Sequence, residues 1–184
     1  MRARILILFA TVAGVLVLGG CSSTSTSSFT PMDTGLSPRG PVVTDAPVLR
    51  VVDGDTIHVL VDGRDTTVRL LGINTPETVK PNSPVECFGP EASEFMKAVL
   101  DGKRVTLEFD ESQGRLDKYG RTLAYVWLPM ESGGLDLINR DLVAGGFAYQ
   151  RQYGAQPVTW QSELIEAQRQ ARDSKTGLWG ACRS

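Results

Sequence analysis

The sequence predicts an α+β fold in which a five-stranded β-barrel carries three α-helices. Its 184 residues, 41% of them hydrophobic, are enough for one ordinary domain with a buried core and a tail. Short runs rich in Val, Leu and Ile alternate with Asp-Gly turn signals at 53–54 and 62–63. Five short strands in a chain of this size favour a small closed or partly open barrel. The predicted strands are 48–52, 56–61, 66–71, 104–109 and 122–128.

Three segments between and after these strands have helical patterns: 90–100, 135–144 and 157–173. The first has Pro and Glu in its first turn, and the second ends at a Gly-Gly pair, which is typical of a helix stop. In the third, apolar residues at helical spacing form one stripe, made of Trp160, Leu164, Ala167 and Ala171. We expect one domain over residues 46–184.

The first 20 residues predict a targeting segment rather than part of the domain. Arg2 and Arg4 precede an apolar run at 5–18, which is shorter than the roughly 20 residues that a membrane-spanning helix needs. The Leu-Gly-Gly-Cys sequence that ends at Cys21 resembles the lipobox of bacterial lipoproteins, in which cleavage precedes a cysteine that then carries lipid. We therefore expect a lipoprotein signal peptide at 1–20 and a lipid on Cys21 that anchors the domain to the membrane outside the cytoplasm. An ordinary secretory signal with an incidental cysteine is the alternative.

Residues 21–45 are rich in Ser, Thr, Pro and Gly, which predicts a flexible linker. Removal of 1–20 would take away two arginines and no acid, so the formal net charge would change from -2 to about -4. The exported chain would then hold Cys87 and Cys182 as a pair in an oxidising setting. There we expect a disulfide rather than two free thiols.

The composition limits the chemistry. One histidine excludes an HExxH zinc site, a Cys2His2 site and any mechanism that needs two imidazoles. Acid–base work must therefore fall mainly to carboxylates, Lys, Tyr or metal-bound water. With 19 Lys and Arg against 21 Asp and Glu there is no global basic excess, so a nucleic-acid partner would have to be bound by local clusters.

Four stretches place polar residues where a barrel needs only turns. They are 53–56 (Asp-Gly-Asp-Thr), 69–78 (Arg-Leu-Leu-Gly-Ile-Asn-Thr-Pro-Glu-Thr), 87–93 (Cys-Phe-Gly-Pro-Glu-Ala-Ser) and 117–121 (Asp-Lys-Tyr-Gly-Arg). In this order and spacing they closely resemble the staphylococcal nuclease (thermonuclease) family, over roughly residues 46–180. The resemblance implies an OB-fold-like barrel and a Ca²⁺-dependent, sugar-nonspecific nuclease that hydrolyses the phosphodiesters of DNA and RNA to 3′-phosphate products.

Such a reaction needs positive charge where negative charge develops at phosphorus. A hard divalent cation and guanidinium groups can supply it without imidazole, and the planar fork of Arg matches two phosphate oxygens. A carboxylate near the metal can orient or deprotonate water. The resemblance assigns the guanidinium role to Arg69 and Arg121, which would hold the scissile phosphate. It assigns the carboxylate role to Glu77, which would act on the attacking water.

The resemblance also implies a metal site and a nucleotide site. The implied Ca²⁺ ligands are Asp55, Asn74 and the backbone carbonyl of Thr75. Lys118 and Tyr119 match positions that contact the terminal phosphate of a bound nucleotide.

Two positions depart from the family pattern. Asn74 stands where the family often has Asp; it keeps a carbonyl oxygen but loses a full charge, which predicts weaker Ca²⁺ binding or looser metal preference rather than lost activity. The family has paired tyrosines after the Leu-Val-x-x-Gly helix, but no ungapped register brings Tyr149 or Tyr153 onto those positions. Either can stack on a base or pack under the last helix, and Tyr153 is the favoured substrate-binding candidate.

The leading hypothesis is therefore a monomeric, lipid-anchored nuclease that binds DNA and RNA mainly through their phosphates. A catalytically inactive OB-fold lipoprotein that binds oligonucleotides is the alternative, because the same barrel class serves as a binding module. Such a module has no need for Glu77, which disfavours it. A surface lipoprotein with a structural or adhesive role would leave the site motifs unexplained.

Overall fold

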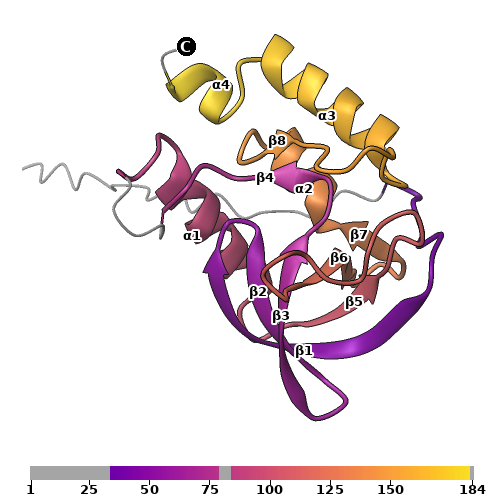
Figure 1. The fold of residues 1–184 in the computed structure, drawn as a ribbon. Helices are drawn as coiled ribbons and strands as arrows, with labels where there is room; N and C mark the ends of the chain where they lie inside the picture. Colours follow the sequence, from indigo (N-terminus) through magenta and orange to yellow (C-terminus); the bar gives the residue numbers. More distant parts are fainter. Residues whose placement is uncertain (1–33, 79–83, 183–184) are drawn as a thin grey trace, which may run out of the picture.

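Five strands close into a barrel in the computed structural model, which describes residues 34–78 and 84–182 (Figure 1). β1 pairs with β2 and β5, β2 pairs with β3, and β5 pairs with β6, all antiparallel. A parallel pairing of β3 with β6 closes the ring. The barrel strands are β1 (Val42–Asp53), β2 (Thr56–Val61), β3 (Arg64–Leu70), β5 (Arg104–Glu108) and β6 (Thr122–Pro129). With the helices described below, this confirms the predicted α+β, OB-fold-like class.

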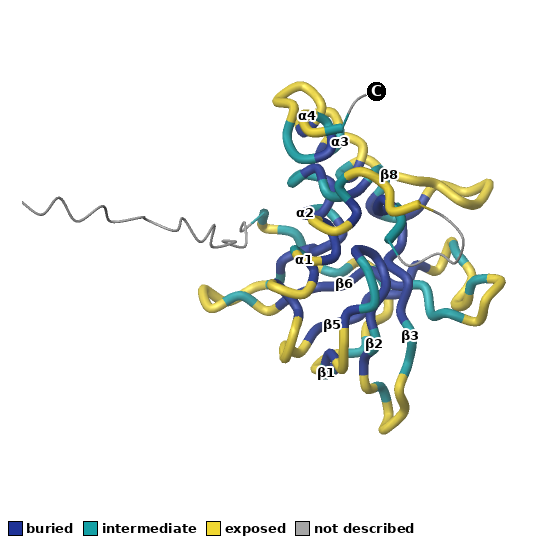
Figure 2. The backbone as a smooth tube through the Cα atoms, turned by 90° about the vertical axis from the view of Figure 1, so that its left-hand side faces the viewer, coloured by how far each residue is buried: buried dark blue, intermediate teal, exposed yellow. Residues whose placement is uncertain are grey.

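The second Asp-Gly signal forms a two-residue hairpin between β2 and β3. Asp62 and Gly63 have φ angles of 49° and 73°, and Val61 pairs with Arg64 across them. Positive φ at both central residues matches the right-handed twist of the flanking strands, and this is why Asp-Gly favours such turns. Figure 2 shows the tip of this hairpin as exposed, whereas the strands become buried toward the barrel.

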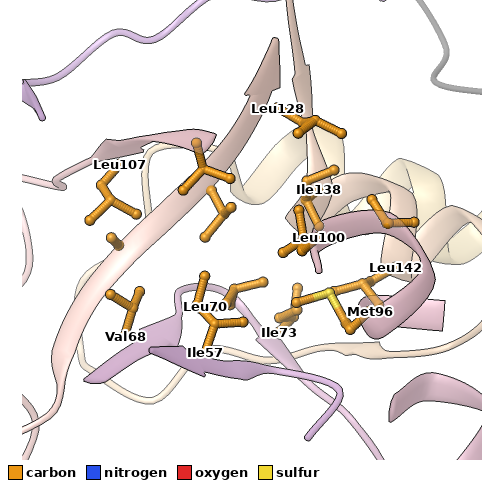
Figure 3. Close-up of a cluster of buried hydrophobic side chains, with 14 of the residues drawn as sticks. Ile57, Val68, Leu70, Ile73, Met96, Leu100, Leu107, Leu128, Ile138 and Leu142 are labelled. Carbon is orange, nitrogen blue, oxygen red and sulfur yellow. The ribbon is translucent and has the colours of Figure 1, made fainter. Parts of the chain in front are cut away.

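Alternate strand residues point into the barrel and meet side chains of two helices there (Figure 3). Ile57 on β2 and Leu107 on β5 are fully buried in this core. Met96 and Leu100 come from α1 (Gly89–Leu100), and Leu142 comes from α2 (Ile138–Ala144). Complete burial of each such aliphatic side chain contributes about 1.5–3 kcal/mol to folding, so the helices belong to the same core as the strands.

The predicted helix over 135–144 is wrong in its first turn. Leu135–Leu137 form a short strand, β7, which pairs with β6 and is followed at once by α2. The edge of β6 offers backbone hydrogen-bonding groups to this segment, and Leu137 pairs with Trp127 there. The pairing of this segment with β6 therefore outweighs its local helical pattern.

Three further short elements and a shifted helix complete the described chain. β4 (Ile73–Asn74) and β8 (Tyr149–Gln150) pair as a two-stranded antiparallel sheet. α3 (Gln161–Asp173) begins four residues later than the predicted 157, and α4 (Leu178–Ala181) is a short fourth helix. In Figure 1, α3 and α4 lie on the opposite side of β4 and β8 from the β2–β3 hairpin. Within the described ranges, no helix has the length and apolar character that a membrane crossing requires.

The domain begins before residue 46, because β1 starts at Val42, inside the predicted linker 21–45. The buried carboxylate of Glu108 explains this. Its Oε1 accepts hydrogen bonds from the backbone N–H groups of Arg39 at 2.6 Å and Gly40 at 2.8 Å. The segment just before β1 is therefore part of the fold. The predicted signal peptide 1–20 and the lipidation at Cys21 lie outside the described residues.

The other oxygen of Glu108 connects two tryptophans. Oε2 accepts hydrogen bonds from Nε1 of Trp127 on β6 at 2.8 Å and from Nε1 of Trp160, which precedes α3, at 2.9 Å. The side chain of Glu108 is 1% exposed, so all four donors are needed to compensate the loss of hydration of its charge. One carboxylate thus joins the amino-terminal segment, the barrel and the start of the last long helix.

A disulfide joins Cys87 and Cys182 across 95 positions of sequence, as the cysteine count predicts. It links the segment before α1 to the residue that ends α4. Because the two cysteines are 95 positions apart, the bond closes a long loop and so restricts the unfolded chain strongly.

Replacing both cysteines by serine should lower the free energy of unfolding by about 4–5 kcal/mol, because the cross-link closes a long loop in the unfolded chain. Urea unfolding of wild type and of the Cys87→Ser, Cys182→Ser double variant measures this. Wild type under a reducing agent serves as an independent removal of the bond. Equal unfolding midpoints in all three samples would contradict the stabilising role.

Two aspartates are buried together near the junction of β7 and α2. Asp136 is 0% exposed and Asp141 is 7% exposed. Burial, then a hydrogen bond with Asp136 and the charge of Asp136, raise the pKa of Asp141 to about 8, although Arg140 opposes this shift. The two carboxyl groups therefore share a proton at neutral pH.

This pair should make the protein less stable as pH rises. The folded-state pKa of Asp141 lies above its unfolded value, so its contribution is complete below about pH 4 and is lost as pH rises toward 8. Asp141→Asn keeps a donor toward Asp136 without a titrating proton. The variant should gain on the order of 2 kcal/mol over wild type in unfolding free energy at pH 8 relative to pH 5. Denaturant unfolding at the two pH values tests this, with the exposed Asp62→Asn as control; identical pH dependence in wild type and Asp141→Asn would refute it.

Candidate active site

A single cleft of about 740 Å³ brings together the residues that the resemblance marks as functional. It is lined from the β1–β2 turn, the chain that follows β3, the loop before β6 and the loop between β8 and α3. The predicted residues that line it are Asp55, Arg69, Asn74, Thr75, Glu77, Lys118, Tyr119, Arg121 and Tyr153. Segments up to about 100 residues apart in sequence thus meet at one site. The single histidine, His58, lies on β2 away from this lining and contacts Asp65.

Asp55 and Arg69 form a buried ion pair at one wall of the cleft. The register of β2 and β3 pairs Thr56 with Arg69, which brings the neighbouring Asp55 within reach. Nη2 of Arg69 lies 2.9 Å from Oδ2 of Asp55, and the two side chains are 9% and 8% exposed. The same Oδ2 accepts a hydrogen bond from the N–H of Thr75 at 2.9 Å, and Oδ1 accepts one from the Thr56 hydroxyl at 3.1 Å. These contacts fix the carboxylate in one orientation.

Oxygen atoms surround the inner nitrogen of Arg69. Besides Asp55, Nη2 donates to the carbonyl of Ile73 at 3.0 Å and to Oδ1 of Asn74 at 3.2 Å. Nη1 donates to the carbonyl of Leu70 at 2.6 Å. The loop after β3 therefore wraps around the guanidinium, which explains how the protein buries this charge on an apolar strand.

The β1–β2 turn and the loop after β3 touch each other closely beside this ion pair. A Cβ on Gly54 would lie 2.7 Å from Cγ2 of Thr75, so the turn requires glycine at this point. Burial and the neighbouring charge of Asp55 raise the pKa of Asp53 to about 6. Two carboxylates so close together repel, and a cation beside them would relieve that repulsion.

The oxygen atoms at this wall fit a hard divalent cation. Asp55 offers a carboxylate, Asn74 an amide oxygen and Thr75 a backbone carbonyl, and Ca²⁺ prefers such ligands. Across residues 34–78 and 84–182, no cluster of three or more His, Cys, Asp or Glu side chains is placed to hold a metal. A cation here would therefore depend on one carboxylate supported by amide and carbonyl oxygens, with the neighbouring Asp53 as a further acidic group.

Arg121 is held by a second carboxylate. Its Nε donates to Oδ2 of Asp117 at 2.7 Å, and its backbone N–H donates to Oδ1 at 2.9 Å. Partial burial opposes ionisation of Asp117, but these hydrogen bonds and one from the N–H of Tyr119 outweigh it and lower its pKa. Asp117 engages the Nε edge of Arg121 and orients the terminal nitrogens, which in an arginine suit two phosphate oxygens.

Lys118 and Tyr119 lie on the turn that precedes β6, and both are exposed. The Tyr119 ring is 71% exposed, with Nζ of Lys118 4.9 Å and Cζ of Arg121 5.5 Å from its centroid. Asp117 fixes this turn through its hydrogen bonds to the N–H groups of Tyr119 and Arg121. The turn therefore presents two positive charges and an aromatic face to the cleft together.

Glu77 lies in the chain that follows β4, and Glu86 holds it from the other side of the loop. The N–H of Glu77 donates to Oε2 of Glu86 at 3.0 Å, and the N–H of Glu86 donates to the carbonyl of Glu77 at 2.9 Å. Oε1 of Glu77 accepts from the N–H of Thr78 at 2.9 Å. The loop ends are thus joined beside Cys87, whose disulfide connects them to the end of the chain.

The two alternative tyrosines have different environments. Tyr149 is half-buried and packs edge-on against Trp179 at 5.3 Å between ring centroids, which is a packing role. Tyr153 is 67% exposed and lines the cleft. Its hydroxyl donates to Oδ1 of Asn74 at 2.6 Å and accepts from Nη2 of Arg69 at 3.2 Å. The Tyr153 hydroxyl is therefore one more of the polar groups that surround the Arg69 guanidinium.

The cleft also contains residues that the sequence analysis did not select. Asp117 stands inside the Asp-Lys-Tyr-Gly-Arg stretch, and Asp53 inside Asp-Gly-Asp-Thr, so position in a motif was a usable signal for both. Glu86 precedes the Cys-Phe-Gly-Pro stretch by one residue. Arg151 has no such signal, because only the pairing of β4 with β8 brings it to the cleft.

Comparison with known proteins agrees with this site. Residues 67–181 match the family model described as staphylococcal nuclease homologue. The chain is 44% identical over 132 residues to Thermonuclease of Staphylococcus hyicus (72% of this chain, 73% of that protein). It is 47% identical over 133 residues to Thermonuclease of Staphylococcus intermedius (72% and 74%). It is 43% identical over 101 residues to the protein named Endonuclease YncB of Bacillus subtilis (strain 168), covering 55% of this chain and 47% of that protein. The chain therefore belongs to the staphylococcal nuclease family.

Proposed function

We propose that this protein hydrolyses DNA and RNA in a Ca²⁺-dependent, sugar-nonspecific reaction that leaves 3′-phosphate ends. Its family membership makes it a phosphodiester-hydrolysing nuclease. The observation that carries the proposal is the convergence of Arg69, Arg121 and Glu77 on the cleft that also holds the oxygens of Asp55, Asn74 and Thr75.

The two arginines supply positive charge from separate elements. Arg69 comes from β3 and Arg121 from the residue just before β6, and Asp55 and Asp117 orient them. Because these partners hold the guanidinium groups before substrate binds, little reorganisation is needed when charge develops on the phosphate oxygens. Arginine keeps its charge at all working pH values, so this stabilisation does not depend on protonation.

Glu77 acts on the attacking water. Its carboxylate accepts the proton, or fixes the water by a hydrogen bond, while the water oxygen bonds to phosphorus and the bond from phosphorus to the 5′ oxygen breaks. The 5′ oxygen takes a proton from solvent and leaves as a hydroxyl group. The phosphate then stays on the 3′ side. Asp55, Asn74 and the Thr75 carbonyl would hold Ca²⁺, which would supply a further positive charge beside the phosphate.

Binding through the phosphates explains why both DNA and RNA would be substrates. Arg69, Lys118 and Arg121 bind the phosphate backbone without reading base edges. Tyr119 and Tyr153 add exposed aromatic faces, and stacking on them tolerates any base. The proposal therefore includes both DNA and RNA.

The proposal also covers the place and state of the enzyme. The amino-terminal sequence supports export and anchoring to the membrane by a lipid on Cys21, with the domain outside the cytoplasm. In this proposal the protein acts as a monomer. The disulfide between Cys87 and Cys182 is consistent with an oxidising compartment.

Glu77→Gln should lower kcat about 10²–10⁴-fold on single-stranded and duplex DNA, because the variant loses its general base. Cleavage is measured on gels with Ca²⁺ and with EDTA, and the ends are identified by their phosphate. Glu131→Gln, on an exposed turn, is the matched control and should cleave like wild type. If wild type binds DNA but shows no metal-dependent cleavage, the binding-module alternative is correct instead.

Asn74→Asp should bind Ca²⁺ about tenfold more tightly than wild type, or more, because ligand charge tunes Ca²⁺ affinity. Tyr153 can still donate its hydroxyl proton to the new carboxylate. Calorimetric titration of Ca²⁺ into both proteins, without substrate, measures the difference. An unchanged dissociation constant would mean that residue 74 is not a metal ligand.

A further inference from the structure

Arg151 is a cation in the cleft that the reaction as described does not use. Arg69 and Arg121 each have a carboxylate partner there, Asp55 and Asp117. Arg151 is exposed and lines the same cleft, yet it makes no ion pair with any carboxylate of the described residues. A guanidinium that faces a cleft without a carboxylate partner among the described residues can bind an anion from solution.

The backbone around Arg151 is fixed relative to the catalytic loop. β4 and β8 pair with Ile73 opposite Gln150, and the N–H of Arg151 continues this ladder by donating to the carbonyl of Gly72 at 2.8 Å. From the other side, the side chain of Gln168 on α3 accepts the N–H of Gln150 at 2.9 Å. Arg151 therefore starts from a rigid base rather than from the free part of a loop.

The ring of Tyr153 lies near both Arg69 and Arg151. Cζ of Arg69 is 5.7 Å and Cζ of Arg151 is 5.9 Å from its centroid. The two guanidinium groups are therefore at most about 12 Å apart, which lies within the span of one or two nucleotides along a single strand. The hydrogen bond from Tyr153 to Asn74 holds the ring in this position.

We propose that Arg151 forms a phosphate-binding subsite separate from that of Lys118 and Tyr119, which holds the phosphodiester next to the scissile one on the side of Tyr153. Its guanidinium binds two non-bridging oxygens, and Tyr153 offers its exposed face to the base between the two phosphates. The ligand is a strand of nucleic acid with at least two successive phosphates. This inference rests on the proposed function, and it adds a specificity for longer substrates that Arg69, Arg121 and Glu77 do not provide.

The subsite acts on binding and not on the bond that breaks. Arg151→Ala should therefore raise KM for an eight-nucleotide single strand about 5- to 30-fold and leave kcat within twofold. For a dinucleotide with one phosphodiester, kcat/KM should stay within twofold of wild type. Arg151→Lys should restore part of the loss, since it keeps the charge but not the planar fork.

A binding measurement separates this inference from the proposed function. Fluorescence anisotropy of a labelled eight-nucleotide strand is followed against salt, with Glu77→Gln as the background protein so that the strand stays intact. Adding Arg151→Ala to that background should reduce the slope of log K against log salt by about 0.7, the value for one phosphate contact in a single strand. Arg64→Ala, an exposed arginine at the β2–β3 hairpin, is the control for loss of one charge and should leave the slope unchanged.

Equal effects of Arg151→Ala and Arg64→Ala would overturn the subsite, and so would an equal loss on the dinucleotide and on the longer strand. A slope change specific to Arg151 would support the subsite even if wild type cleaved no substrate. In that case the proposed hydrolysis would be wrong and the subsite would stand.

Discussion

The fold depends on one buried charge. Glu108 accepts hydrogen bonds from four N–H groups, and its donors come from the segment before β1, from β6 and from the start of α3. A carboxylate with 1% exposure is tolerable only when all its donors are in place, so these three parts must assemble together. The chain between β8 and α3 forms one wall of the cleft, and the contact of Glu108 with Trp160 fixes the far end of that chain.

The cleft itself is built on pairs of opposite charge rather than on a basic surface. Asp55 orients Arg69 and Asp117 orients Arg121, so both arginines assigned to the scissile phosphate are already held by an anion. This arrangement suits an acidic protein, because it concentrates oriented positive charge locally without an overall basic excess. It also has an energetic cost: burial, and then the charge of the neighbouring Asp55, raise the pKa of Asp53.

Local patterns in the sequence were enough for the barrel strands, and the resemblance of the motifs to the family was enough for most of the residues that line the cleft. The Asp-Gly turns gave β2 and β3 to within two residues, and the motifs identified Arg69, Glu77 and Arg121, which the cleft then brings together. Features that depend on contacts between distant segments were not accessible in this way. The strand β7 requires the edge of β6, the true start of the domain requires Glu108, and the position of Arg151 requires the pairing of β4 with β8.

The disulfide beside the site can form only at a certain stage in the maturation of each molecule. Cys87 follows Glu86, which forms hydrogen bonds with both the backbone N–H and the carbonyl of Glu77. The bond to Cys182 cannot form until synthesis has reached that residue, well after the barrel strands have been made. The disulfide beside the loop that carries Glu77 therefore forms only after residue 182 has been made and an oxidant is present. A nascent or reduced chain contains the barrel sequence but lacks this disulfide. Formation of the bond therefore distinguishes the mature protein from both.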